Sequence, residues 1–517
     1  MDMRFHIIAR TMTFPSSGND VAFLKIDHWN DYSFVTMFDV VVFDAAGKRA
    51  DLGAVKIGFV SQTEDISTYT TLEEQFDVLP QHYFSLGQDV EYYQKIRSNL
   101  SAETAEAYLR GLRDMAFDEA YQRIASGQRV FRTSLLRSVS VSSLEKDGQF
   151  KRVLDGRAPL TDFDFGFARP QSDTMAAVEM RFKVVAGSKP STNIHALIGR
   201  NGVGKTTILN DMVRAIMAPT ETQAAFYRPG LFGNTPIERT YFSSLISVAF
   251  SAFDPFKPPA EQPDPEKGTR YYYLGLKDGE DDGGILLKSL TALRDECATS
   301  LRECFSDSGR TTRWLTAIRT LESDENFALM NLGQLVTYSG DVLQRESRSI
   351  VDKMSSGHAV VLLTISRLVA KVEEKTLVLI DEPESHLHPP LLSAFTRAIS
   401  ELLHNRNGVA IIATHSPVVL QEVPRSCASV VIRQRLSMVV TPPTIETFGE
   451  NAGVLTREVF GLEVIKSGFH DLLARAVRAG GTYDEIIAEH GGQIGMEARG
   501  ILRAMVAERD SSRSTLS

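Results

Sequence analysis

The hydrophobic residues of segment 1–160 occur in short runs separated by turns, a pattern typical of β-strands. The stretch FVTMFDVVVFDAAGKRADLGAVKIGFV holds two such runs on either side of a turn at Ala46–Lys48, and it predicts a β-hairpin. Between Ser101 and Ser126, apolar residues recur at helical spacing behind a serine, which predicts a helix. We therefore expect residues 1–170 to form an α+β accessory domain.

The pattern changes near Thr174, where an α/β core is predicted to begin and to extend over residues 171–465. Strands are predicted at Val178–Val185 and Ile194–Ile198, followed by a helical run from Ile208 to Met217. Two later apolar runs are typical of strands buried on both faces of a parallel sheet, and a helix is predicted between them. The runs are TLVLI at 376–380 and VAIIA at 409–413, and the helix carries Leu391, Leu392, Phe395, Ile399, Leu402 and Leu403 on one face.

A long section between Pro219 and Asp352 interrupts this core. It holds a proline-rich loop, FDPFKPPAEQPDPEKG, and a segment that predicts a hairpin, YYYLGLKDGEDDGGILL. Helices are predicted around Leu287–Phe305 and Thr311–Leu321, and no long heptad repeat predicts a coiled-coil arm. We expect this section, at about 219–352, to form a helical insert subdomain.

The final segment, 466–517, predicts helices followed by a frayed tail. Thr482 and Glu485 form a capping-box pattern ahead of Ile486. Apolar stripes between Phe469 and Glu508 could recruit a partner, although amphipathic helices more often cover the body of their own protein.

The composition is typical of a globular protein with more than one domain. A chain of 517 residues is expected to fold as two or three domains, and 43% hydrophobic with 23% charged residues excludes a disordered or fibrous class. The net charge of −9 argues against a basic surface, so nucleic-acid binding cannot be inferred from charge. The three cysteines form no disulfide framework, no apolar stretch is long enough to span a membrane, and the first residues lack a signal peptide. We expect a cytoplasmic protein without membrane association.

The strongest chemical pattern lies between a predicted strand and a predicted helix. Gly199-Arg-Asn-Gly-Val-Gly-Lys-Thr206 matches G-x-x-x-x-G-K-[ST], a loop whose backbone N–H groups surround phosphates at a helix N-terminus. Lys205 is expected to reach the β- and γ-phosphates, and Thr206 to ligate Mg²⁺. A glycine-rich turn with an incidental Lys-Thr is the alternative, and the flanking elements argue against it. The predicted nucleotide-binding residues here are Gly199, Asn201, Gly202, Gly204, Lys205, Thr206 and Thr207.

Polar side chains follow two of the predicted buried strands. Asp381 and Glu382 come directly after the run at 376–380, at the end of a strand where ligands bind in open α/β sheets. Asp381 is predicted to hold Mg²⁺ and Glu382 to polarise the attacking water; a solvated strand end is the alternative. His415 ends the next strand, and we predict that it contacts the γ-phosphate, although a lone histidine there is often structural.

A fourth segment, Met354-Ser-Ser-Gly-His358, precedes an apolar helix, and an Asp-Glu-Pro-Glu-Ser-His-Leu-His-Pro string runs from Asp381 to Pro389. Together with the phosphate loop, these segments resemble ABC-type ATPases of the RecF-like and OLD-like class, and they are similar to the ATPase subunit of bacterial anti-phage systems such as Septu. The resemblance covers about Thr174–Leu462. It implies an ABC-type P-loop core with a mixed or parallel sheet, and hydrolysis of ATP with Mg²⁺ through catalytic Glu382, His415 and Lys205.

The resemblance also implies how two copies assemble. Ser355, Ser356 and Gly357 would bind the γ-phosphate of ATP held by another protomer, giving a homodimer or higher oligomer through an ATP sandwich. His388 would lie in the loop that crosses this interface. The segment departs from the transporter form, because Ser356 replaces a glycine and His358 replaces a glutamine or glutamate. Without the resemblance, this segment is a serine N-cap.

One expected element of ABC ATPases is missing, because no glutamine follows the predicted strand Leu245–Phe250. Ser251 or Asp254 is the candidate substitute. This absence, the long N-terminal addition and the non-transporter signature argue against a transporter ATP-binding subunit. A protein that holds ATP without hydrolysing it is also disfavoured, because Glu382 is present.

The favoured hypothesis is a nucleotide-dependent switch in bacterial anti-phage defence. It would control a separately encoded, nucleic-acid-directed effector, with a nuclease of the HNH type as the expected partner. No second carboxylate or histidine cluster in the sequence has the spacing of a metal nuclease. A RecF-like ATPase of DNA repair or recombination is the main alternative, since it shares every nucleotide motif, and direct binding of DNA or RNA stays open.

Overall fold

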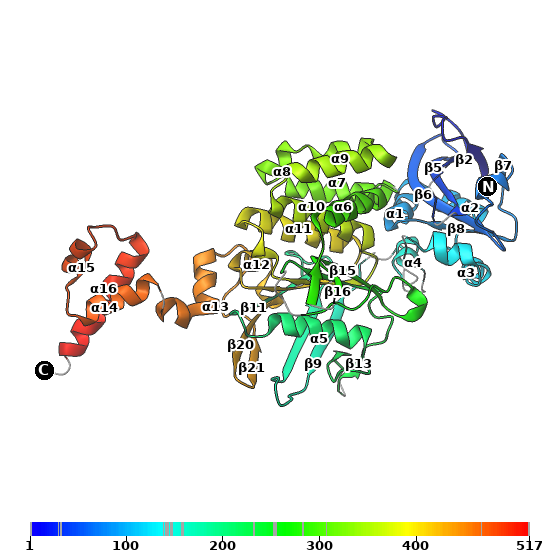
Figure 1. The fold of residues 1–517 in the computed structure, drawn as a ribbon. Coiled ribbons are helices and arrows are strands. Elements are labelled where there is room, and N and C mark those ends of the chain that lie inside the picture. The colour runs from blue at the N-terminus through cyan, green and yellow to red at the C-terminus, as the bar shows by residue number, and fades with distance from the viewer. Residues whose placement is uncertain are drawn as a thin grey trace.

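The computed structural model describes residues 3–28, 30–31, 34–137, 139, 144, 148–156, 160–230, 233–251, 256–281, 284–306, 308–466 and 468–514. In Figure 1 an N-terminal α+β unit lies at one end and a C-terminal helical unit at the other, with an α/β body between them. None of the described helices is long and apolar enough to cross a membrane.

The N-terminal unit is built on a sheet with strand order β7-β1-β2-β5-β6-β8, in which β1 and β2 pair in parallel and the other pairs are antiparallel. Its strands are β1 (Arg4–Ile8), β2 (Val21–Ile26), β5 (Met37–Phe43), β6 (Arg49–Phe59), β7 (Gln75–Phe76) and β8 (Tyr83–Gly87), with a small pair formed by β3 (Asn30–Asp31) and β4 (Phe34–Val35). The predicted hairpin is confirmed as β5 and β6, joined through Gly47 at a φ of 75°.

The single helix predicted between Ser101 and Ser126 is wrong. The structure has α2 (Ala102–Gly111) and α3 (Glu119–Ala125), preceded by an unpredicted α1 (Val90–Asn99) and followed by α4 (Gln149–Leu154). Helices α2 and α3 are separated by a turn at Asp114. The buried carboxylate of Asp114 holds this turn, because it accepts the backbone N–H groups of Ala116 and Phe117.

The body contains a seven-stranded sheet of order β15-β14-β18-β19-β11-β20-β21, and every neighbouring pair is parallel except β20 with β21. Strands β11, β18 and β19 are buried at every position, as their continuous apolar runs predict. The strands are β11 (Ile194–Ile198), β14 (Ser244–Ala249), β15 (Arg270–Gly275), β18 (Thr376–Asp381), β19 (Val409–Thr414), β20 (Ala428–Gln434) and β21 (Ser437–Thr441).

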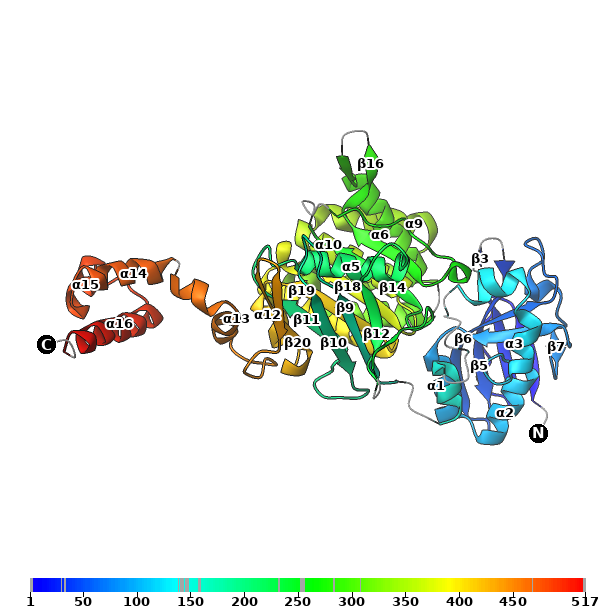
Figure 2. The same ribbon diagram turned by 90° about the horizontal axis from the view of Figure 1, so that it is seen from below.

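Two different layers cover this sheet (Figures 1 and 2). One face packs against α5 (Lys205–Met217) and an antiparallel sheet of order β10-β9-β12-β13. The other face packs against the helices α6, α7, α9, α10 and α11. The remaining bounds are β9 (Phe163–Arg169), β10 (Val178–Val184), β12 (Ala225–Arg228), β13 (Thr235–Pro236), α6 (Leu290–Cys304), α7 (Ser308–Leu321), α8 (Glu325–Leu329), α9 (Gly340–Lys353), α10 (Ser356–Lys371), α11 (Pro389–Asn405) and α12 (Pro417–Gln421).

The hairpin predicted from the whole segment YYYLGLKDGEDDGGILL is only partly right. Its first part is β15, which pairs in parallel with β14 inside the central sheet. Only β16 (Lys277–Asp281) and β17 (Gly284–Leu287) form a hairpin. Residues 271–274 are all buried, and a strand buried on both faces suits the edge of a large sheet covered by a layer on each side better than a protruding hairpin.

The C-terminal helices α13 (Ala452–Lys466), α14 (Phe469–Arg478), α15 (Tyr483–Glu489) and α16 (Met496–Ser514) confirm the predicted helical segment. The capping box is confirmed, with the Glu485 N–H donating to Thr482 Oγ1 at 3.3 Å. The apolar stripes of α14, α15 and α16 pack on one another in a small core around Leu473, Ile486 and Leu502. The alternative, in which these stripes cover the α/β body, is therefore not what the described residues show.

Buried ion pairs join the N-terminal unit to the body. Asp89, which caps α1, pairs with Arg313 of α7 and lies 3.6 Å from Arg406, which follows α11. Arg152 of α4 donates to Glu374, just before β18, at 3.0 Å. All five side chains are at most 9% exposed. Burial alone would raise the pKa of Asp89, but the two arginines and the Glu91 N–H outweigh it and lower the pKa to about 2.

Replacing Asp89 with Asn is expected to lower the free energy of unfolding by about 3 kcal/mol at neutral pH, because two buried arginines lose their counter-charge. Since the folded pKa lies below the unfolded value, the stability due to Asp89 is present above about pH 4 and is lost as the pH falls toward 2. Urea unfolding measures both effects.

The matched control is Asp51→Asn, at an exposed position on β6, which is expected to change the free energy by less than about 0.5 kcal/mol. Equal losses in the two variants would show that the Asp89 contacts do not stabilise the junction.

Candidate nucleotide site

The carboxyl ends of the central parallel strands meet at one edge of the sheet. The ladder registers place Ala249 of β14 beside Asp381 of β18, and Asp381 beside Ala413 of β19. Ile198, the last residue of β11, pairs with Thr414. The segments that follow these strands therefore start side by side, and they carry the residues that the sequence analysis selected.

The phosphate loop connects β11 to α5, as predicted. Gly202 and Gly204 have φ angles of 78° and 101°, which side chains rarely adopt, so glycine is required at both positions. Gly199 is required for space, because a Cβ atom there would lie 2.4 Å from the carbonyl oxygen of Val431 in β20. Asn201 is exposed in the loop itself.

Lys205 begins α5 with its side chain folded toward this loop. Its Nζ donates hydrogen bonds to the carbonyl oxygens of Gly199 at 2.9 Å and Arg200 at 3.1 Å. Burial lowers the pKa of the ammonium group. Three nearby carboxylates act against this shift, and they belong to Glu382, Glu384 and Asp381. The structure thus brings the loop lysine and the acidic end of β18 together.

The predicted Mg²⁺ ligands lie on the two elements that flank the site. Thr206 and Thr207 are in the first turn of α5, and both are partly buried. Asp381, at the end of β18, is 6% exposed. A hydroxyl and a carboxylate are oxygen donors of the kind that Mg²⁺ prefers, with water and phosphate oxygens completing its shell. Thr206 and Asp381 therefore fit this ion, which would neutralise phosphate charge when bound.

Glu382 has a backbone conformation that turns the chain sharply away from β18. Its φ and ψ angles are 46° and 57°, in the left-handed region that non-glycine residues seldom occupy. The Glu382 N–H donates to the carbonyl oxygen of Ala413 in β19 at 2.9 Å. Such strain persists where the surroundings impose it, and it is typical of functional positions. The predicted catalytic glutamate is therefore held in place by the neighbouring strand.

Glu384 is a site residue that the sequence analysis missed. One of its carboxylate oxygens accepts hydrogen bonds from Thr414 Oγ1 at 2.7 Å and from the backbone N–H of His415 at 2.6 Å. The same oxygen lies 3.0 Å from Nδ1 of His415. Glu384 therefore holds the backbone at His415 and places a carboxylate beside the imidazole that we predicted to face the γ-phosphate. The sequence shows Glu384 within the string from Asp381 to Pro389, but it does not show that Thr414 and His415 are its hydrogen-bond partners.

The signature segment lies at the N-terminus of α10 in the helical layer. Ser355 caps the helix, Ser355 and Ser356 are exposed, and Gly357 is buried. A Cβ atom on Gly357 would lie 2.4 Å from the carbonyl oxygen of His386, so this glycine lets α10 pack against the loop after β18. The N-cap alternative is confirmed, because Ser355 Oγ accepts the His358 N–H. The signature role stays a prediction, and the exposure of the capping serine is compatible with it.

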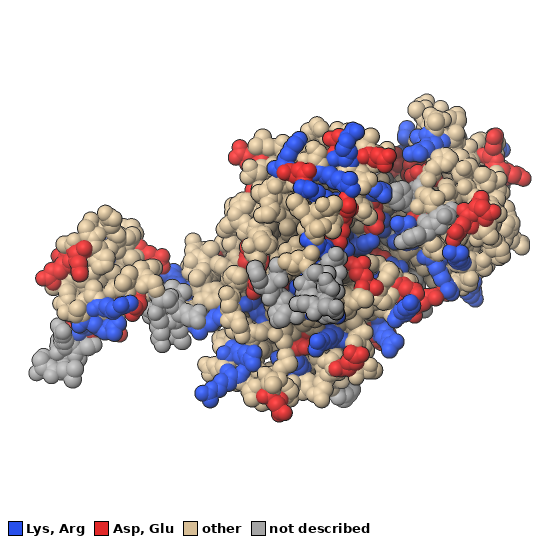
Figure 3. Space-filling view, viewed as in Figure 1, with Lys and Arg blue, Asp and Glu red and all other residues tan. Residues whose placement is uncertain are grey.

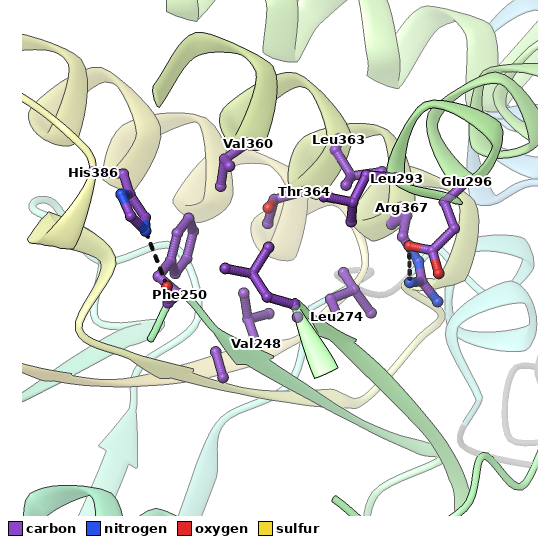
Figure 4. A pocket seen from close by; sticks show the side chains of 13 residues that line it. Val248, Phe250, Leu274, Leu293, Glu296, Val360, Leu363, Thr364, Arg367 and His386 are labelled. Carbon is purple, nitrogen blue, oxygen red and sulfur yellow. Dashed lines mark hydrogen bonds and ion pairs between the residues drawn. The ribbon is translucent and has the colours of Figure 1, made fainter. Parts of the chain in front are cut away.

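The segment expected to replace the glutamine loop follows β14. Ser251 is partly buried at this edge, and Asp254 lies outside the described residues. Beside it is a pocket between β14, β15, α6 and α10 (Figure 4). Apolar side chains line most of it, with His386 bonded to the Phe250 carbonyl oxygen at one end and a Glu296–Arg367 ion pair at the other.

Comparison with known proteins gives a relative that matches the chain over its length. Protein ea59 of Escherichia phage lambda is 47% identical over 528 residues, covering 99% of this chain and 99% of the relative. The chain belongs to the ea59 family. A family model described as "AAA domain, putative AbiEii toxin, Type IV TA system" also matches residues 322–421. This segment includes Asp324, Asp381, Glu382 and His415.

Solved ATP-binding cassettes are similar to a part of this ea59-family chain. The cassette MJ1267 of an ABC transporter, in its ADP conformation, is 13% identical, with 59% of this chain and 98% of that chain covered and a TM-score of 0.30. The protein cbiO1 from Clostridium perfringens, part of an ABC transporter complex, is 15% identical, with 59% and 95% covered and a TM-score of 0.31.

In this ea59-family chain, the phosphate loop, the largely parallel sheet and the acidic strand end form an α/β P-loop core, as the sequence predicted. Backbone N–H groups at the start of α5 and the Lys205 ammonium group can surround a polyphosphate. Glu382 follows β18 close to them, and its carboxylate acts on the Lys205 ammonium group.

Lys205→Ala is expected to weaken ATP binding at least about tenfold, because the loop loses the cation that faces the phosphates. Equilibrium titration with a fluorescent ATP analogue measures the change. Lys183→Ala, at an exposed position on β10, removes the same kind of charge and serves as the control. If the two variants bind ATP equally well, Lys205 has no part in holding the phosphates.

Proposed function

We propose that the chain hydrolyses ATP to ADP and phosphate and uses the nucleotide state to control a nucleic-acid-directed effector. The observation that carries the ATPase proposal is that the phosphate loop, with Lys205 donating to its carbonyl oxygens, lies near the carboxylates of Asp381, Glu382 and Glu384 at one edge of the sheet. An apolar strand end has no structural need for three acidic groups around one buried lysine. Phosphate chemistry explains all four side chains.

The roles of the side chains follow from their positions. Lys205 and the loop N–H groups bind the phosphates, and Thr206 with Asp381 holds the Mg²⁺ that neutralises their charge. Glu382 polarises the attacking water and takes its proton. His415, whose Nδ1 lies 3.0 Å from Glu384, donates to the terminal phosphate and stabilises the charge that develops there.

The same proposal places two copies head to tail with ATP between them. Ser355 and Ser356 are exposed at the first turn of α10, where helix N–H groups favour an anion. Bound in this way, ATP would be part of the interface, and its hydrolysis would open the assembly. A homodimer is the smallest such arrangement.

The additions at both ends support a controlling role in the cytoplasm, where ATP and Mg²⁺ are available. The C-terminal unit stands away from the body in Figures 1 and 2 and exposes Phe469, Leu472 and Met496. These residues line one groove together with α16, and exposed apolar grooves are typical of protein contacts. The proposed partner is an effector nuclease. In Figure 3 basic and acidic residues are interspersed, so the visible face does not favour nucleic acid over protein.

A RecF-like or OLD-like class, with a defence role, is part of this proposal. A relative in a phage and a family description that names a toxin–antitoxin system are compatible with it. Stimulation of hydrolysis by DNA without any partner protein would instead favour the RecF-like repair alternative.

The Glu382→Gln variant is expected to bind ATP but to hydrolyse it at least about a hundredfold more slowly, because the amide cannot take a proton from water. The trapped nucleotide should make the chain associate, which light scattering and phosphate release can measure. Glu238→Gln, at an exposed position, is the control and should keep normal turnover. An absence of ATP-dependent association in Glu382→Gln would rule out the sandwich.

The chain alone is expected to leave DNA intact, because its identified catalytic groups serve ATP. Purified chain is incubated with ATP, Mg²⁺ or Mn²⁺ and plasmid or single-stranded DNA, with and without the product of the neighbouring gene. Cleavage should require that product. Cleavage by the chain alone that survives repurification would overturn the controller proposal.

A further inference from the structure

A chain of hydrogen bonds lies behind the signature serine. Ser355 Oγ is 2.6 Å from Nδ1 of His358, and Nε2 of the same imidazole is 3.1 Å from a carboxylate oxygen of Asp324. Ser355 is exposed, whereas His358 and Asp324 are 8% and 7% exposed. The hydroxyl at the surface is therefore connected to a buried acid through one imidazole.

Asp324 determines which nitrogen of His358 carries a proton. Burial would raise the pKa of this carboxyl group, but the Phe327 N–H and the side chains of His358 and His388 outweigh it and lower the pKa. Asp324 is thus a carboxylate at neutral pH and can only accept hydrogen bonds. The 3.1 Å contact then requires the proton of His358 on Nε2.

This assignment has a consequence for Ser355. In a neutral imidazole with its proton on Nε2, Nδ1 has only a lone pair, so the 2.6 Å contact uses the hydrogen atom of the Ser355 hydroxyl. One lone pair of the hydroxyl accepts the His358 backbone N–H as the helix cap, and the hydroxyl then presents only its other lone pair to solvent. A phosphate oxygen needs a donor, and lone pairs repel it.

We propose that His358 is a proton-operated positioning residue: an added proton on Nδ1 reverses its hydrogen bond with Ser355 and frees the serine hydroxyl to donate to the γ-phosphate of ATP on another protomer. This inference rests on the proposed ATP sandwich and adds its regulation. The proton comes from solvent, and no covalent bond changes. Assembly is therefore coupled to proton uptake.

The surroundings of His358 support a single ring position with two charge states. Among the described residues, the ring lies against Ser355 at the start of its own helix, Asp324 before α8, His388 before α11, and the ring of Phe327 at a centroid distance of 5.3 Å. His388 Nε2 is 3.0 Å from the other oxygen of Asp324, so one carboxylate faces both imidazoles. Its negative charge can balance a proton gained by His358 without movement of the ring.

A glutamine in place of His358, as in the transporter form of the motif, would behave differently. Its amide carries donors and an acceptor at every pH in the neutral range, so it can donate to Ser355 Oγ without gaining a proton. The His358 imidazole can donate to Ser355 Oγ only after Nδ1 has gained a proton. Because the active form is the protonated one, assembly is favoured at low pH and is lost as the pH rises.

The experiment measures ATP-dependent association of the full chain between about pH 6 and about pH 8, in the Glu382→Gln variant that traps ATP. The association constant is expected to fall by up to about tenfold per pH unit at the upper end. Adding His358→Gln should reduce the total change to less than about threefold, because the amide needs no proton. Adding His404→Gln, at an exposed position near the end of α11, should leave the slope unchanged.

Binding of a fluorescent ATP analogue and thermal unfolding are recorded at each pH, so that nucleotide affinity and folding are separated from assembly. The role of His358 is overturned if the association constant of the Glu382→Gln parent does not change with pH. It is also overturned if the pH dependence persists after His358→Gln is added. Both results leave the ATP sandwich intact. A pH dependence fully matched by nucleotide affinity overturns the role of His358 as well. If the parent fails to associate at any pH, the sandwich and this inference both fall.

Discussion

The parallel pairing of β14, β18, β19 and β11 is the constraint on which the site depends. Parallel strands end at a common edge, and their apolar side chains force both faces to be covered by other layers. The polar residues that follow these strands consequently gather where no layer covers them. Lys205, Asp381, Glu382 and His415 are brought together by the sheet, and the loops between them need only turn in the right direction.

Close backbone contacts determine those directions. Gly199 lets the phosphate loop lie against β20, and Gly357 lets the first turn of α10 lie against the loop that follows Glu382. Both contacts involve a carbonyl oxygen at a distance that no Cβ atom could occupy. The signature helix and the acidic strand end therefore belong to one packed unit, and a change at either one reaches the other through backbone contact.

The N-terminal and C-terminal units are attached to the body by different kinds of contact. The N-terminal unit is joined to the body through buried arginines and carboxylates near the amino ends of β18 and β19, at the opposite edge of the sheet from the nucleotide site. A buried, charged junction is costly to open, because each separated charge must be paired again. The C-terminal unit has its own small core and follows α13, so it can present its apolar groove independently of the body.

The sequence by itself determined the features that depend on neighbouring residues. Glycines at positive φ, an apolar run ending in Asp381 and Glu382, and a serine before an apolar helix are local patterns, and the structure places each of them as predicted. The break at Asp114 and the true partner of β15 were missed, because a buried turn and the pairing of a covered edge strand depend on distant packing. Only the tertiary structure could show that Glu384 turns back to His415, and that Asp324 meets His358 across 34 residues. Local spacing specifies elements, whereas the contacts between them depend on how the buried surfaces fit.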